Sequence, residues 1–191
     1  SLRVLDIPDL TTEGSFGFGS ALAAVLAAGV HTYLSLPIAF LGGMAAGLIT
    51  GLLQTKLQVH PVLAGIITMS GLYSVNLIVR GGPNLSIGAA NLFKQFYKAL
   101  HLTGDQRKVA GALLALVICL VVTLLLIVFF KTHVGLCIRA TGDNQDMVRA
   151  SSINTAFTIT VGLCVSNAMT SLSGAVLAQY QKSADINLGT G

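Results

Sequence analysis

An all-α, polytopic membrane protein is the fold class that the sequence predicts, from three observations. Of the 191 residues, 53% are hydrophobic and only 9% carry a charged side chain, whereas a soluble domain usually has about 25% charged residues. The mean hydropathy is +0.79. Four long runs contain no Asp, Glu, Lys or Arg: residues 14–55, 57–79, 109–130 and 150–181. So few charges cannot cover a soluble globule of this size, and the composition also argues against a disordered chain.

The uncharged runs are long enough for about five membrane-spanning helices, because one crossing takes about 20 apolar residues. The first run holds two helices, and His31 and Thr32 leave almost no connection between them, so we expect an antiparallel pair. The first predicted helix is short for a full crossing, and a broken or partly re-entrant helix is an alternative there. The predicted spans are residues 14–30, 33–53, 61–79, 109–130 and 153–180.

Small residues recur every four positions on two of these spans. In lipid, such stripes let helix backbones approach closely, since apolar burial against lipid tails gives little drive to associate. The stripes predict plain packing between helices, and the alternative is a helix–helix contact that moves. The stripes are Gly43, Gly47 and Gly51 on the second span, and Thr170, Gly174 and Ala178 on the fifth.

The connection over residues 80–108 predicts an amphipathic helix that lies in the membrane interface, because its apolar and basic residues fall on opposite faces. Nucleic-acid binding is the other use of such a basic stretch, but two lysines on one short helix provide too little positive charge for it. We therefore predict no nucleic-acid partner. The apolar face is Leu92, Phe93, Phe96, Tyr97 and Leu100, and the basic face is Lys94, Lys98 and His101.

The next connection, residues 131–149, reads KTHVGLCIRATGDNQDMVR and contains a short capped helix. Asp143 is the expected N-cap, with Asp146 three residues later as in an acidic relative of the capping box, and Gly142 supplies the turn. Met147 and Val148 follow as an exposed apolar pair. Such a helix suits docking into a groove on a partner protein, and a solvated loop is the alternative.

One stretch of the sequence resembles a known family. Residues 135–174, GLCIRATGDNQDMVRASSINTAFTITVGLCVSNAMTSLSG, closely resemble the cytoplasmic coupling segment and following helix of bacterial ABC importer permeases of the branched-chain amino acid and ribose type. Residues 9–24, DLTTEGSFGFGSALAA, resemble the element after the first helix of that family, and residues 51–84 continue the match. The most similar subgroup includes permeases described as tryptophan or tyrosine transport components, which work with a solute-binding protein and an ATPase.

This resemblance implies one transmembrane permease domain over residues 1–191 that is incomplete at both ends, in the bacterial inner membrane. The implied partners are an ABC ATPase subunit, an extracytoplasmic solute-binding protein and a second permease subunit, identical or different. ATP and Mg would be used by the ATPase, and no cofactor would be bound by this chain. The implied solute is an amino acid or a related small compound.

The resemblance also assigns residues 143–150, within the coupling segment 131–150, as the coupling helix. It would sit in a cleft of the ATPase and pass nucleotide-driven closure to the membrane helices. The residues expected at this contact are Arg139, Gly142, Asp143, Asn144, Met147, Arg149 and Ala150.

The family places residues 9–20 near the solute path. Polar groups in membrane-compatible sequence are expensive unless they face a cavity or the interface, and solvation at a helix end is the alternative. On the third span, Tyr73 and Asn76 could line the same path, although an Asn bonded to a neighbouring helix is the commoner role. The candidates in the first segment are Asp9, Thr11, Thr12 and Glu13.

Enzyme chemistry is not indicated. The chain has no GxxxxGK phosphate loop, so ATP hydrolysis belongs to another subunit. The four His residues lie at segment edges without metal-ligand spacing, and no metal site is predicted. A secondary transporter or channel is the alternative function, disfavoured because the four uncharged runs hold no residue for ion coupling.

The charges argue against the orientation that the resemblance implies. If the coupling segment lies inside the cell, the alternation of membrane spans puts Lys56 inside too. The inner side then carries four basic residues: Lys56, Lys131, Arg139 and Arg149. Six basic residues fall outside, so the positive-inside rule favours the reverse orientation, and we follow the resemblance. The six are Arg80, Lys94, Lys98, Arg107, Lys108 and Lys182.

Overall fold

The computed structural model describes residues 9–28, 32–82, 84–87 and 106–185, and it confirms the all-α fold class. Two three-residue strands are the exception within this part of the chain. The elements in chain order are α2 (Thr11–Ala28), η1 (Thr32–Leu34), α3 (Ser35–Thr55), α4 (Pro61–Arg80), β1 (Asn84–Ser86), α6 (Gln106–Lys131), α7 (His133–Asp143), α8 (Gln145–Ala150), α9 (Thr155–Gln181) and β2 (Ser183–Asp185).

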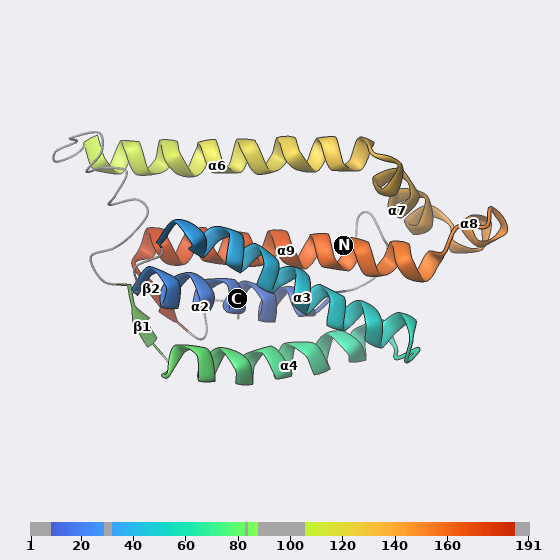
Figure 1. Cartoon of the computed structure of the whole chain (residues 1–191), viewed down its shortest axis with the longest axis horizontal. Coiled ribbons are helices and arrows are strands. Elements are labelled where there is room, and N and C mark those ends of the chain that lie inside the picture. Colours follow the sequence, from blue (N-terminus) through green and yellow to red (C-terminus); the bar gives the residue numbers. More distant parts are fainter. Residues whose placement is uncertain (1–8, 29–31, 83, 88–105, 186–191) are drawn as a thin grey trace.

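Helices α2, α3, α4 and α9 form a bundle in which α9 packs against both α2 and α3. Figure 1 shows α2 and α3 running in opposite directions, as predicted, while α6 lies along α9 on the side away from α4. The turn between α3 and α4 lies at the same end of the molecule as α7 and α8, and the strands lie at the other end. We call these the coupling end and the strand end.

Four of the described helices are long and apolar enough to cross a membrane, and they correspond to the predicted second to fifth spans. Helix α2, the counterpart of the first predicted span, is not among them. It begins at Thr11, three residues before the predicted start, and no break interrupts it up to Ala28. The count of five spans therefore stays a prediction. The interfacial helix predicted over residues 92–101 lies outside the described residues.

Glycines let α3 approach the backbone of α9. A Cβ at Gly43 would lie 2.5 Å from the carbonyl oxygen of Asn167, and one at Gly47 would lie 2.5 Å from that of Leu163. A Cβ at Gly51 would lie 2.9 Å from the Cα of Thr160. On the neighbouring side of α9, Gly174 faces the Phe16 carbonyl of α2 in the same way. Any side chain at these positions would force the helices apart.

Strands β1 and β2 pair antiparallel and close the strand end, with Leu85 opposite Ala184. The pairing ties the segment after α4 to the segment after α9, and the Ile87 amide extends it by donating to the Lys182 carbonyl at 2.9 Å. Ile87 and Ala184 pack on buried alanines of α2 and α9. The two strands therefore hold the C-terminal ends of α2, α4 and α9 together.

Candidate functional site

The sharp corner between α6 and α7 is built around Thr132 and Gly135. The Thr132 hydroxyl accepts the Gly135 amide at 3.4 Å and caps α7. A Cβ at Gly135 would lie 2.5 Å from the Cα of Phe130, so only glycine fits in the turn. The sequence predicted a connection here, and the structure corrects this to an eleven-residue helix, His133–Asp143.

Helix α7 is fixed to both neighbouring spans. Ile138 is 1% exposed and packs against Phe129 of α6 and against Ile159 and Val161 of α9. The hydroxyls of Thr141 and Thr158 lie 2.9 Å apart and add a hydrogen bond between α7 and α9. Helix α7 is therefore in contact with α6 and α9 at the same time.

The N-cap of α8 is Asn144, and the prediction of Asp143 is wrong. The Asn144 side-chain oxygen accepts the amides of Asp146 and Met147, both at 3.1 Å. Asp143 is instead the last residue of α7, and Gly142 lies within that helix, so Gly142 does not supply the turn. The packing of Ile138 and Thr141 extends α7 to Asp143, and this places Asn144 at the junction.

The surface presented by α7 and α8 combines apolar side chains with charges of both signs. Met147 is 70% exposed, whereas Val148 is only 5% exposed. The prediction of an exposed apolar pair is therefore confirmed for Met147 and wrong for Val148. Arg149 donates from Nε to the Thr155 hydroxyl at 3.3 Å, which ties α8 to the start of α9. Leu136, which the sequence did not single out, is 56% exposed. Of the remaining predicted contact residues, Gly142 is half-buried, and Arg139, Asp143, Asn144 and Ala150 are exposed.

A second group of polar residues lies inside the bundle, where α2 begins part-way along α9 (Figure 1). The Asp9 carboxylate accepts the Thr11 amide at 3.0 Å and the Asn167 side-chain amide at 2.9 Å. The Ser15 hydroxyl donates to the Asn167 side-chain oxygen at 2.5 Å. All four residues are at most 9% exposed. We call Asp9, Thr11, Ser15 and Asn167 the mid-bundle node.

The predicted solute-path residues are therefore divided. Asp9 and Thr11 point into the node, and the Thr11 hydroxyl lies 3.0 Å from that of Thr50 on α3. Thr12 is half-buried and Glu13 is exposed, so these two side chains remain accessible.

The other two candidates, on α4, are not brought together. Tyr73 is 51% exposed, whereas Asn76 is 3% exposed and faces α2 beside Gly17. Among the residues that the structure describes, none forms a hydrogen bond with the side-chain oxygen of Asn76. The two residues therefore face different surroundings.

Arg80, at the end of α4, was counted from the sequence as a loop charge, but it is 5% exposed. Its Nη2 donates to the Gly17 carbonyl at 2.9 Å and to the Ser20 hydroxyl at 2.6 Å. The guanidinium thus links α4 to the middle of α2. Nothing in the sequence indicated that Arg80 is buried, because a charge at the boundary of a membrane span is ordinarily solvated.

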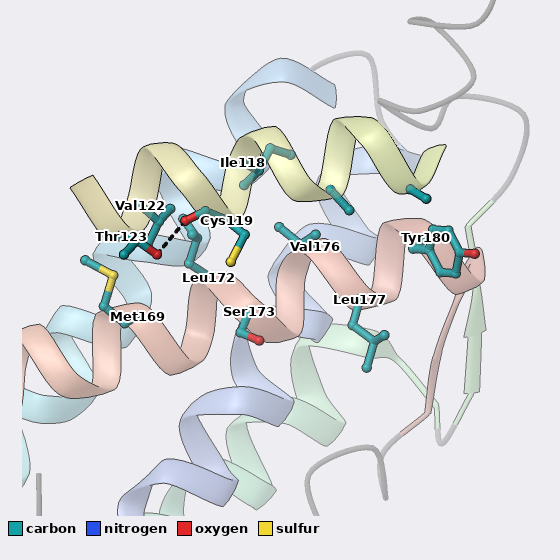
Figure 2. A pocket seen from close by; sticks show the side chains of 12 residues that line it. Ile118, Cys119, Val122, Thr123, Met169, Leu172, Ser173, Val176, Leu177 and Tyr180 are labelled. Carbon is teal, nitrogen blue, oxygen red and sulfur yellow. Dashed lines mark hydrogen bonds between the residues drawn. The ribbon is translucent and has the colours of Figure 1, made fainter. Parts of the chain in front are cut away.

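A cavity of about 390 Å³ lies between α6 and α9. Figure 2 shows Ile118, Cys119 and Val122 of α6 opposite Leu172 and Val176 of α9. Its polar side chains are few, and the Thr123 hydroxyl already donates to the Cys119 carbonyl at 2.7 Å. None of the predicted solute-path residues lines this cavity. No three His, Cys, Asp or Glu residues gather as metal ligands within the described ranges.

The whole chain, residues 1–191, matches the family model described as "Branched-chain amino acid transport system / permease component". The chain belongs to this permease family. Membership and the four apolar helices together make it a multi-pass membrane protein, which in bacteria lies in the inner membrane. The resemblance found in the sequence is thereby confirmed.

The chain has relatives in three bacteria. It is 32% identical over 190 residues to the tyrosine transport system permease protein of Clostridioides difficile (strain R20291), covering 99% of this chain and 61% of the relative. It is 32% identical to the uncharacterized protein RP368 of Rickettsia prowazekii (strain Madrid E), covering 100% of this chain and 65% of the relative. It is 26% identical to the galactofuranose transporter permease protein YtfT of Escherichia coli (strain K12), covering 88% of this chain and 47% of the relative.

The chain thus spans less than two thirds of the length of these relatives. No solved structure matches it significantly.

Proposed function

We propose that the chain is the permease subunit of an ATP-driven ABC importer, which moves a small solute delivered by a solute-binding protein. The observation that carries this proposal is the attachment of α7 and α8. Both helices project at the coupling end, and Ile138 and Thr141 tie α7 to α6 and α9. A partner that moves α8 therefore moves two spans. Membership in the permease family supports the same function.

The partners in this proposal are an ABC ATPase, a solute-binding protein and a second permease subunit. The ATPase subunit would bind ATP with Mg and hydrolyse it. Its contact with this chain would be made by Met147, Leu136 and Arg139, which are exposed at the coupling end. Exposed apolar side chains beside charged ones suit a groove on a folded partner.

We propose an amino acid or a related compound as the solute. This is supported by the relative named as a tyrosine transport permease, which matches 99% of the chain at 32% identity. The relative named for galactofuranose matches less of the chain at lower identity. Thr12 and Glu13 are the accessible groups that would face the solute.

Substitution of Met147 by Glu tests the ATPase contact. The change puts a charge on the 70% exposed apolar side chain at the third position of α8, where Glu is favourable for a helix N-terminus. Helix α8 should therefore persist while docking fails. We expect at least a tenfold loss of ATPase that co-purifies with the full-length permease from membranes.

Leu57→Glu is the matched control, because Leu57 is 67% exposed in the turn between α3 and α4 at the same end. It should retain the ATPase. If the wild-type permease does not co-purify with an ATPase, or if Met147→Glu retains it fully, the proposed contact is wrong.

A further inference from the structure

Helix α9 contacts both the coupling helices and the start of α2. Near its first turn it meets α7 through Thr158 and Thr141, and further along it meets the mid-bundle node through Asn167. Thr158 and Asn167 are nine positions apart, which corresponds to about 13.5 Å of helix at 1.5 Å per residue. One rigid element thus joins the surface that would meet the ATPase to the segment that carries Thr12 and Glu13.

Close backbone contacts leave α9 little freedom to slide past α2 and α3. The Ser171 hydroxyl donates to the Ala39 carbonyl of α3 at 2.5 Å, and Gly19 of α2 packs directly on the Ser171 backbone. Because a packed interface changes by discrete rearrangement rather than by continuous deformation, the body of α2 would follow α9, and the node extends this connection to the first turn of α2.

Asn167 is chemically suited to hold this node. Its amide nitrogen donates to the Asp9 carboxylate and to the Leu163 carbonyl, at 2.9 and 3.0 Å, while its oxygen accepts from Ser15. A side chain that both donates and accepts is needed here, because the carboxylate only accepts while Ser15 presents its single hydroxyl proton. That proton is shared between the Asn167 oxygen at 2.5 Å and the Thr11 carbonyl at 3.0 Å. An apolar residue would leave the buried Asp9 carboxylate short of a partner.

We propose that Asn167 is a positioning residue, which fixes the first turn of α2 to α9 so that movement of α7 and α8 reaches the solute path. This proposal rests on the proposed importer function. It assigns a role to a residue that contacts neither the ATPase nor the solute, and it makes the coupling depend on a defined hydrogen bond between Asn167 and Asp9.

The test uses the full-length permease with its ATPase and solute-binding protein in proteoliposomes. In N167D two carboxylates face each other in a buried site, so we expect at least a tenfold loss of solute uptake per ATP hydrolysed. Basal ATPase activity and co-purification of the ATPase should stay within twofold of wild type. A merely structural defect would lower all three.

The exchange D9N/N167D supplies the rescue. It places the amide at position 9, where the Asn oxygen can still accept from the Thr11 amide, and the carboxylate at position 167, where it still accepts from Ser15. We expect uptake per ATP to recover at least threefold over N167D. T170V is the matched control, because the Thr170 hydroxyl donates within α9, to the Ser166 carbonyl at 3.0 Å, and it should behave as wild type.

Three results would overturn the positioning role: full uptake per ATP in N167D, no recovery in D9N/N167D, or a loss in T170V equal to that in N167D. If N167D does not reach the membrane, S15A removes one bond of the node instead and should lower uptake per ATP two- to fivefold; unchanged coupling in S15A then contradicts the role. Wild-type protein without uptake or ATPase would contradict the importer function itself.

Discussion

Gly47 and Gly71 are both glycines in apolar spans, yet their surroundings differ completely. A Cβ at Gly47 would lie 2.5 Å from a backbone oxygen of α9, whereas a Cβ at Gly71 meets nothing within 4 Å. Gly47 therefore sets the distance between two helices. Gly71 only lowers the helix propensity of α4.

Alanine at these two positions should consequently have opposite effects. Gly47→Ala should destabilise the protein by about 1–3 kcal/mol, the usual cost of overpacking, because the contact is with backbone that cannot rotate away. Gly71→Ala should stabilise by up to about 1 kcal/mol, the helix-propensity difference between the two residues. Thermal unfolding in detergent measures both, and equal effects would contradict the α3–α9 contact.

The hydrogen bond from Arg80 to Ser20 is the second contact that a single substitution can test. Ser20→Ala leaves one Nη2 donor of a 5% exposed guanidinium without its partner. An orphaned buried donor costs about 1–3 kcal/mol, and more when it is charged. We expect a clearly lower unfolding temperature, while Ser173→Ala, at an exposed serine of α9, should change it little. A Ser20→Ala protein as stable as wild type would mean that Arg80 is solvated.

The sequence carried part of this information at the residue scale. The glycine stripes were recognisable by their spacing, because backbone approach in lipid requires small residues. Asn167 was not singled out, although an amide in the middle of an apolar span is itself a signal that a partner exists. Its partner Asp9 is 158 positions away in the chain, and no local pattern reports such a contact.

At the scale of elements, α7 and α8 were the hardest to predict. Helix α7 has no long apolar run, and its length depends on Ile138 and Thr141 packing on α6 and α9. Asp143 and Asn144 are both good N-cap residues, so the sequence alone could not choose between them. The four apolar helices, by contrast, follow from the uncharged runs directly.

Separate alanine substitutions distinguish the two caps. Asn144→Ala removes the acceptor for two amides of α8 and should destabilise that six-residue helix by about 1 kcal/mol. Faster hydrogen exchange at the Asp146 and Met147 amides would report it. Asp143→Ala, at the exposed end of α7, should leave these amides unchanged. The reverse pattern would restore Asp143 as the cap.

At the scale of the whole molecule, the structure removes part of the conflict over orientation. Arg80 is buried against α2 and bonded within the bundle, so it does not act as a loop charge. Without Arg80, the number of basic residues that the sequence assigns to the outer side falls from six to five, against four on the inner side. A difference of one residue gives the positive-inside rule little weight. The expected orientation therefore follows from the proposed function, which needs α8 inside the cell.

Single cysteines can test this orientation in a cysteine-free background, made by replacing Cys119, Cys137 and Cys164. Ser151→Cys and Gln58→Cys lie on exposed residues at the coupling end, and Lys182→Cys lies on an exposed residue at the strand end. A membrane-impermeant maleimide should label only Lys182→Cys in intact spheroplasts, and the other two only after permeabilisation. Labelling of Ser151→Cys in intact spheroplasts would put α8 outside, beyond reach of an ATPase, and would contradict the importer proposal. Opposite labelling of Ser151→Cys and Gln58→Cys would instead contradict the fold, because both turns lie at one end of the bundle.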